Sequence, residues 1–352
     1  MTPSAPRPQP ERSRGVWRAL AGALVSVAFL WLAFRGVDWA GAWASMVQAD
    51  GWLLLAGLAS VLVGIALRAE RWRLLFYPHH RNLRLFECFS TMLIGQAVNA
   101  VAPLRAGEVV RALLIGEIEG VSKALAIWTT VVEKVLDSAA LLGLLALASL
   151  TMPLPAWVRG AAWAVTLGLV ISLAVVTIIV RHEAAGMAWM ARLEGRLAWL
   201  ARLRPGRLVA AVATSVRLMG HPSLAVALLV RSVIITVALS ATNWIVGLAM
   251  GLQLPIMAYG LLFATLQISA IVPLPTSPGR LGVFHYLCVV VLGLYGVERD
   301  VALAYGLVLH LLVYLPTAVG GPLLLWLENR RGHALGRVLG LRAPAGEQGL
   351  EP

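Results

Sequence analysis

The stretch GQAVNAVAPLRAGEVVR, residues 95–111, interrupts apolar sequence with an amide pair, a Pro–Gly break and three charges. The apolar runs around the break, about residues 86–102 and 109–115, are each too short or too polar for a full membrane span. At about 1.5 Å per residue, the second run covers only roughly half of a ~30 Å hydrocarbon core. The pattern therefore predicts a helical hairpin that enters the membrane and turns back. Because non-helical backbone is tolerated at that depth only inside protein or beside a cavity, this stretch is the first candidate for a binding site.

The composition is typical of a membrane protein. Hydrophobic residues make up 59% of the chain and charged residues 13%, whereas a soluble domain carries roughly 25% charged residues. The predicted fold class is an all-α polytopic membrane protein. The formal net charge of +12 indicates cytoplasmic loops and contact with anionic lipid, and no basic–aromatic pattern of a nucleic-acid module accompanies it. Cys88 and Cys288 lie in apolar segments and predict packing residues, so no disulfide, metal site or cofactor is expected.

Six full spans are predicted in a single transmembrane domain over residues 16–327. They lie at about residues 16–34, 52–67, 123–150, 156–180, 224–250 and 301–327. A basic, disordered segment (residues 1–15) precedes this domain, and a basic cytoplasmic tail (residues 328–352) follows it. Between the fourth and fifth spans, residues 189–207 place arginines opposite apolar residues at helical spacing, which predicts an amphipathic helix on an anionic membrane face.

A second interrupted segment has the same form as the first. The apolar run 261–272 ends at the break PLPTSPGRLG, residues 273–282, and a short helix at about 283–295 follows. The order span, span, hairpin, span therefore occurs twice, in halves of about 16–150 and 156–327. Because the halves start on opposite sides of the membrane, we predict an inverted repeat with two re-entrant hairpins, which is typical of transporters.

The distribution of Lys and Arg predicts the orientation. With a cytoplasmic N-terminus and both hairpins turning back, nearly all basic clusters and both termini fall on the cytoplasmic side, as the positive-inside rule requires. The predicted location is the inner membrane, as a multi-pass protein. Two short spans in each hairpin region would keep the same sides, so charge alone does not separate re-entrant hairpins from pairs of short spans.

Polar residues around the two breaks and in the fifth span are the candidate substrate-binding residues. They are Gln96, Asn99, Arg105, Glu108, Arg111, Arg231 and Arg280. Guanidinium groups at both breaks suit an anionic phosphate head group. Each charge costs about 2.5–3.5 kcal/mol at mid-membrane on insertion scales, so a charge without a role is unexpected. Two interpretations stay open: direct contact with the ligand, or a clasp in which Arg105 or Arg111 neutralises Glu108.

A second group of residues is predicted to form a coupling or structural charge network. They are Glu133, Lys134, Asp137 and His285. Glu133 and Asp137 are four residues apart and share one helix face, where they could relay protons or pin the arginines of the first hairpin. The pinning role is favoured. His285 is more typical of a hydrogen-bonded core residue than of a proton carrier, and the basic cluster at residues 68–73 is typical of a positive-inside anchor.

Three motifs occur in an order that resembles a known family. They are N-x-x-x-P-x-R-x-G-E-x-x-R at residues 99–111, E-K-x-x-D at residues 133–137 and P-x-x-P-G-x-x-G at residues 275–282. Together they resemble the transmembrane domain of lysylphosphatidylglycerol synthases and its stand-alone, flippase-like relatives, over nearly the whole chain. The resemblance implies a multi-span inner-membrane protein that moves, or is proposed to move, a lipid between leaflets.

Two positions depart from the family pattern. Lys134 stands where the family usually has Arg, and Lys cannot make the bidentate grip that Arg makes. His285 stands where the family often has Glu, which replaces an acid with a group that titrates near neutral pH. No sizeable domain follows residue 327, so neither the aminoacyl-transfer domain of the bifunctional synthases nor synthesis of lysyl-lipid is expected.

The leading hypothesis is a lipid flippase or lipid-carrier transporter that moves an anionic or prenyl-linked lipid between leaflets, with membrane lipids as its partners. The alternatives are an ion-coupled transporter of a small anionic metabolite and a non-transporting membrane partner of an envelope-lipid biosynthetic enzyme. Enzyme activity is not expected, because the sequence has no phosphate-cradling Gly loop, metal-spaced His/Cys set or Ser nucleophile elbow. The sequence predicts no oligomeric state.

Overall fold

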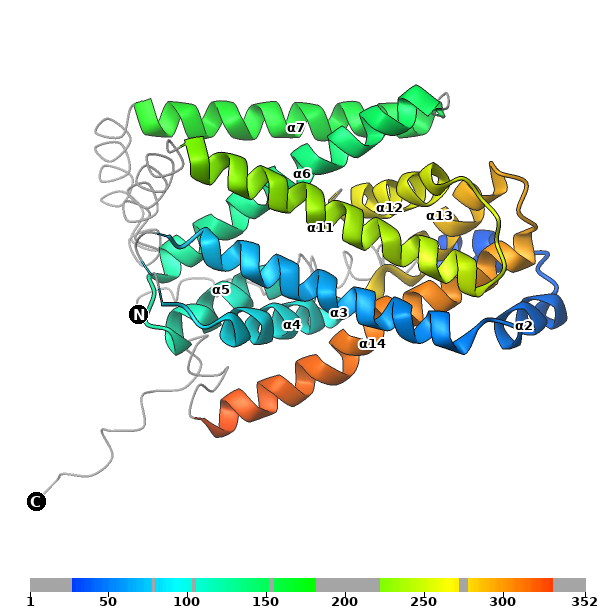
Figure 1. Ribbon diagram of the computed structural model, residues 1–352, viewed down its shortest axis with the longest axis horizontal. Helices are drawn as coiled ribbons and strands as arrows, with labels where there is room; N and C mark the ends of the chain where they lie inside the picture. Colours follow the sequence, from blue (N-terminus) through cyan, green and yellow to red (C-terminus); the bar gives the residue numbers. More distant parts are fainter. Residues whose placement is uncertain are drawn as a thin grey trace, which may run out of the picture.

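The protein folds into a bundle of helices (Figure 1). The computed structural model describes residues 27–77, 80, 82–102, 106–151, 155–181, 222–271 and 278–331. These residues contain helices and no strand, so the all-α prediction is confirmed for them. The predicted segments 1–15 and 189–207, most of the predicted first span, and residues 332–352 lie outside the described residues.

The chain contains long helices and pairs of short helices, after a first helix of which residues 27–34 are described. The labelled helices are α2 Trp39–Val47, α3 Gly51–Leu74, α4 Leu85–Val101, α5 Ala106–Ile118, α6 Lys123–Thr151, α7 Ala156–Arg181, α11 Pro222–Ala249, α12 Ile256–Ile271, η2 Pro278–Arg280, α13 Leu281–Gly293 and α14 Arg299–Arg330. Among the described residues, α3, α11 and α14 contain segments long and apolar enough to cross a membrane. They indicate a membrane protein, and the count of six full spans stays a prediction.

Helix α3 runs further than the predicted span 52–67. It continues through the basic cluster to Leu74, and Arg71 within this extension is 0% exposed. Arg and Glu are good helix formers, so the local sequence does not stop the helix. At the other end, the carboxylate of Asp50 caps α3 by accepting hydrogen bonds from the N–H groups of Trp52 and Leu53. The predicted surface anchor is therefore partly a helical segment of the interior.

Helices α3 and α11 lie side by side and antiparallel through the middle of the bundle (Figure 1). The N–H of Asp50, just before α3, donates to the carbonyl of Ala249 at the end of α11 (2.8 Å). Further along, a Cβ added to Gly64 would sit 2.5 Å from Leu239 Cδ2. Small residues at such an interface let two backbones approach, and van der Waals packing of this kind drives helix association in lipid.

Helices α4 and α5 pack as an antiparallel hairpin. At its open end, Arg84 Nε lies 2.9 Å from Glu119 Oε1, which joins the residue before α4 to the residue after α5. Near the break, the N–H of Gly107 donates to Asn99 Oδ1 (2.8 Å), and a Cβ on Gly107 would overlap the carbonyl oxygen of Gly95. With 17 and 13 residues, the two helices are about 26 and 20 Å long, shorter than a ~30 Å hydrocarbon core.

Helices α12 and α13 form a second hairpin of nearly the same size, with 16 and 13 residues. The short turn η2 directly precedes α13. Arg280 in this turn donates to the carbonyl of Leu266 (3.4 Å) and to Ser269 Oγ (3.2 Å), so the start of α13 is held against the end of α12. Residues 272–277 of the predicted break lie outside the described residues.

The two hairpins open toward opposite ends of the bundle. The first opens where α3 and α14 end, since Glu87 near the start of α4 lies 3.7 Å from Arg331 after α14. The second opens where α11 ends, since Tyr259 of α12 packs against Gly247 and donates its hydroxyl to the carbonyl of Leu252 (3.0 Å). Because α3 and α11 are antiparallel, their C-terminal ends lie at opposite ends of the bundle.

Contacts between helices match across the two halves of the chain. Within each half, the long helix α3 or α11 packs on the first helix of its hairpin, and the last helix, α6 or α14, packs on the second. Across the halves, α4 packs on α14 and α12 packs on α6. Each hairpin therefore lies between long helices of both halves. The turn η2, beside the tip of the second hairpin, reaches α4 of the first.

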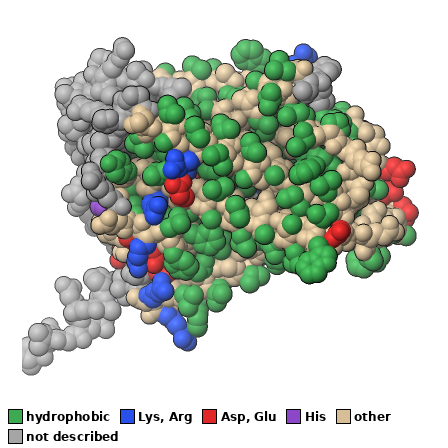
Figure 2. Space-filling view, in the orientation of Figure 1, with side chains coloured by type: hydrophobic (Ala, Val, Ile, Leu, Met, Phe, Trp, Pro, Cys, Tyr) green, Lys and Arg blue, Asp and Glu red, His purple; other side chains and the backbone are tan. Residues whose placement is uncertain are grey.

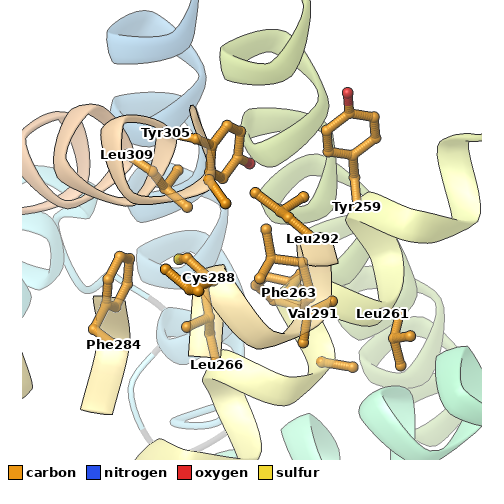
Figure 3. Packing of buried hydrophobic residues seen from close by; sticks show 14 of the residues in the cluster. Tyr259, Leu261, Phe263, Leu266, Phe284, Cys288, Val291, Leu292, Tyr305 and Leu309 are labelled. Carbon is orange, nitrogen blue, oxygen red and sulfur yellow. The ribbon is translucent and has the colours of Figure 1, made fainter. Parts of the chain in front are cut away.

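The largest apolar cluster among the described residues surrounds the second hairpin (Figure 3). In the view of Figure 3, Leu292 of α13 lies between Tyr305 of α14 and Phe263 of α12. Tyr305 is fully buried, and its hydroxyl donates to the carbonyl of Asn243 on α11 (2.8 Å). This bond satisfies a polar group that would otherwise be costly in an apolar core. The second hairpin is therefore packed mainly by apolar contacts.

Charge is distributed unevenly along the molecule. Figure 2 shows hydrophobic side chains over the middle of one face and basic side chains gathered near the end where α3 finishes. The exposed residues Asp38 and Asp50 lie at the opposite end, where α2 and α3 begin. An apolar band between charged ends is expected for a protein that spans a bilayer.

Replacing Gly107 by Ala is expected to destabilise the first hairpin, because the new Cβ would overlap the Gly95 carbonyl oxygen and lie 2.7 Å from Asn99 Oδ1. Overpacking of this kind should lower the free energy of unfolding by about 1–3 kcal/mol, measured by thermal unfolding in detergent. Gly143→Ala in α6 is the control, because no atom lies within 4 Å of its added Cβ. Its stability should be unchanged or higher by up to about 1 kcal/mol. Equal unfolding midpoints for the two variants would contradict the close approach.

Candidate functional site

A chain of alternating charges joins α3, α6 and α5 inside the bundle. Arg71 of α3 lies with its Nη2 2.7 Å from Asp137 Oδ1 and 3.5 Å from Glu133 Oε1, both on α6. Its other terminal nitrogen, Nη1, donates to Ser232 Oγ of α11 (2.8 Å). One buried guanidinium therefore ties both central helices to α6.

The charge chain continues from α6 to the first hairpin. Arg111 Nη2 on α5 lies 2.7 Å from Glu133 Oε2 and 2.7 Å from Glu108 Oε2. Glu108 Oε1 is in turn 3.0 Å from Lys134 Nζ on α6. The side chains of Glu108 and Lys134 are 22% and 38% exposed, whereas that of Glu133 is only 2% exposed. The network therefore runs from a buried core to a partly open end beside the first break.

The network balances three cations with three carboxylates. Taking a charge out of water costs several kcal/mol per ion, and close pairing with hydrogen bonds is what offsets this cost. The Arg111 guanidinium also lies over the Trp72 ring, 4.9 Å from its centroid, and the indole N–H donates to Thr129 Oγ1 (3.0 Å). Because every carboxylate of the network has a cation, the network holds α5 against α3 and α6.

The structure brings five predicted residues into this network and adds one. The predicted members are Glu108, Arg111, Glu133, Lys134 and Asp137. The added member is Arg71, which the sequence interpretation assigned to a surface anchor. The sequence did contain a signal that Arg71 is buried. Arg71 follows Gly57 and Gly64 at seven-residue spacing, which places all three residues on one helix face. The two glycines face neighbouring helices at close range, so this is the interior face.

Other predicted ligands have partners within the protein or lie outside the described residues. Arg231 on α11 pairs with Glu70 on α3, with Nε 2.9 Å from Oε2. Asn99 accepts the N–H of Gly107, as described above. Gln96 is half-buried in the last turns of α4. Arg105, together with the rest of residues 103–105, lies outside the described residues.

The second break carries a cation of a different kind. Among the described residues, no carboxylate lies within ion-pair distance of Arg280, whose guanidinium donates only to α12. Nearby, His285 stacks on His310, with ring centroids 5.1 Å apart, and His310 stacks on Tyr314 at 4.2 Å. His285 is 2% exposed and belongs to this aromatic stack, whereas the ion pairs of the network involve other residues. The second break therefore combines one guanidinium with a stack of polar rings.

The chemistry that these residues offer is anion binding. Guanidinium groups are the side chains best suited to phosphate and carboxylate, because their fixed fork matches two oxygens. The described residues contain no group of three or more His, Cys, Asp or Glu side chains placed to hold a metal ion. The candidate site is accordingly the region where the Arg280 turn packs on α4 of the first hairpin.

Replacing Glu133 by Gln is expected to lower the free energy of unfolding by about 3–5 kcal/mol, because it removes the carboxylate between two buried arginines. Glu117→Gln is the matched control. That carboxylate is 35% exposed and pairs with the exposed Lys123 at 3.2 Å, so the loss should stay below about 1 kcal/mol. Thermal unfolding in detergent measures both variants. Equal stability would show that the buried network does not hold the bundle together.

The family described as "Lysylphosphatidylglycerol synthase TM region" matches residues 19–321. A search of curated proteins found no match. The matched region contains both hairpins, the charge network and the Arg280 turn. Because the match covers most of the chain, this protein belongs to the lysylphosphatidylglycerol synthase transmembrane-region family, as its motifs predicted.

Proposed function

We propose that this protein moves a lipid with an anionic head group between the two leaflets of its membrane. The observation that carries the proposal is the meeting of two interrupted hairpins: the turn that holds Arg280 packs on α4 of a hairpin that opens toward the other end. Many transporters build their substrate sites from interrupted helices related in this way. Membership of a family described by a lipid synthase supports a lipid as the substrate.

The proposed topology has six membrane crossings, two re-entrant hairpins and an inverted repeat. Three features support it: the short helices of both hairpins, their opposite openings and the matched contacts of the two halves. The basic end of the bundle then faces the cytoplasm, in keeping with the positive-inside rule. We accordingly propose an inner-membrane location with both termini in the cytoplasm.

The proposed path follows the contact between the two hairpins. The head group passes the end of α4, which carries Gln96, and the turn that carries Arg280, while the acyl chains stay in the bilayer. An anion without a partner is costly in hydrocarbon, and a guanidinium offsets that cost where the path passes Arg280. The ion-pair network keeps α5 fixed against α3 and α6. The first hairpin therefore keeps its position while the lipid passes.

Cysteine labelling tests whether the first hairpin is re-entrant. In a background in which the buried residues Cys88 and Cys288 are replaced, Ala102→Cys probes the tip and Ser122→Cys probes the open end. We expect a membrane-impermeant maleimide added from outside to leave Ser122→Cys unlabelled and to label Ala102→Cys only slowly, because Ser122 lies at the cytoplasmic end and Ala102 lies inside the membrane beside the proposed path. The same reagent added to inverted vesicles should label Ser122→Cys rapidly. Labelling of Ala102→Cys from outside at that rapid rate would instead show two short spans.

A liposome assay tests the function. Purified protein should speed the transbilayer movement of fluorescent phosphatidylglycerol by about tenfold or more over protein-free liposomes, which corresponds to a barrier lower by about 1.4 kcal/mol. Quenching of the outer leaflet by dithionite measures the movement. Liposomes that contain heat-unfolded protein are the control. If no anionic or prenyl-linked lipid moved faster with the folded protein, the proposed function would be wrong.

A further inference from the structure

We infer that the Gly279–Arg280 turn and the first turn of α13 form a binding site for the phosphate group of a lipid that carries no ammonium. The inference deepens the proposed function and rests on it for the choice of a lipid as ligand. Four observations support it: the backbone of the turn, the unpaired guanidinium, the contrast with the first hairpin and an unpartnered buried ring nitrogen.

The turn leads into a helix start that no N-cap side chain caps. Gly279 and Arg280 have φ values of 69° and 55°, and Arg280 is the one non-glycine residue with positive φ in the described ranges. Arg280 is the N-cap of the 13-residue helix α13, yet its side chain makes no capping hydrogen bond. The first N–H groups of a helix have no partner within the helix, and the helix dipole adds partial positive charge there. Such a helix start binds phosphate when nothing else occupies it.

The guanidinium adds a full charge at the same place. It donates to the carbonyl of Leu266 and to Ser269 Oγ from one terminal nitrogen, Nη1. Arg has five N–H donors in a planar fork, so the other nitrogens remain available to an anion. No carboxylate of the described chain pairs with Arg280, whereas the ion pairs of Arg71 and Arg111 are already made.

In the first hairpin, the corresponding helix start already has an acidic residue of the protein beside it. There, Gly107 is followed by Glu108, which places a carboxylate in the first turn of α5. Asn99 Oδ1 also takes the N–H of Gly107. In the second hairpin the glycine is followed by an arginine instead. The two breaks therefore have the same form and opposite charge, and only the second lacks an internal anion.

A buried ring nitrogen beside the turn also lacks a partner. His285 lies one turn into α13, with Nδ1 2.5 Å from the carbonyl of Leu281, so this nitrogen carries a proton. Its Nε2 is buried without a hydrogen-bond partner. The ring of His310, on which His285 stacks, comes within 3.8 Å of the Cβ position of Gly279. With the proton on Nδ1, Nε2 of the neutral ring is an acceptor, so this unsatisfied nitrogen suits a hydroxyl of the head group and not a phosphate oxygen.

The same part of the protein offers no carboxylate to an ammonium group. The described carboxylates buried or partly buried within the bundle are all ion-paired: Glu70, Glu87, Glu108, Glu133, Asp137 and Glu328. The acids Asp38, Asp50, Glu298 and Asp300 lie instead at the end where α2, α3 and α14 begin. A head group with an ammonium would therefore meet cations without a free anion. The site favours phosphatidylglycerol over its lysyl ester.

The test measures binding, with purified full-length protein in neutral detergent. Dioleoylphosphatidylglycerol, its lysyl ester and inorganic phosphate are each titrated while the unfolding midpoint is followed, because a ligand that binds the folded state raises it. We expect phosphatidylglycerol to bind about tenfold or more tightly than the lysyl ester. Arg280→Gln should weaken its binding by about tenfold or more, the usual effect of losing a charged hydrogen-bonding group. Arg280→Lys should retain part of the affinity, because it keeps the charge and loses the fork.

Arg330→Gln is the control, since that exposed guanidinium lies on Trp326 at the far end of α14 and should not affect binding. Competition by inorganic phosphate would show that the phosphate alone is recognised, and binding of the lipid alone would show that its tails contribute; both support the site. Equal binding by wild type and both Arg280 variants would overturn it, as would equal affinity for the lysyl ester. Arg280-dependent binding without lipid movement would contradict the proposed function and leave the site standing. Lipid movement that Arg280→Gln leaves unchanged would contradict the site and leave the proposed function standing.

Discussion

The ion pairs of Glu133 with Arg71 and Arg111 are the interactions on which the arrangement depends. Helix α5 is too short to cross a bilayer, so lipid alone does not fix its depth. The paired charges do, because separating them would leave unpaired ions in an apolar interior. With α5 fixed beside α6, the first break comes to lie where Glu108 and Asn99 can satisfy the freed helix start. That position in turn decides which part of α4 meets the second hairpin.

The two halves share their contacts and differ in their chemistry. Each hairpin packs between long helices of both halves, yet the first is held by ion pairs and the second mainly by apolar side chains such as Tyr305. The difference is sharpest after the two glycines, where Glu108 stands in one half and Arg280 in the other. The first break therefore has a carboxylate of its own, whereas Arg280 at the second break has no carboxylate partner among the described residues. Two halves with matched helix contacts can in this way differ in the charge that they present at their breaks.

The sequence was sufficient for features that depend on local pattern. Pro–Gly breaks within apolar runs located both hairpins, and the motif around Arg111 identified the family. The sequence was not sufficient for features that depend on packing between helices far apart in the chain. Arg71 looked like a surface anchor because its burial depends on α3 lying antiparallel to α11. The pairing of Arg231 with Glu70 depends on the same register, and the stack of His285 on His310 depends on how α13 meets α14.

The position of α14 against α4 has a consequence for how the protein is made. Arg71, Arg111 and Glu133 all belong to the first half, so their ion pairs can form as soon as α6 has entered the membrane. A chain emerges from the ribosome N-terminus first, and its early part can therefore assemble before α14 exists. Gly321 of α14 packs directly on Ala97 of α4, so this face of the first hairpin stays uncovered until α14 has been synthesised. Insertion of α14 is thus the step that completes the packing around α4.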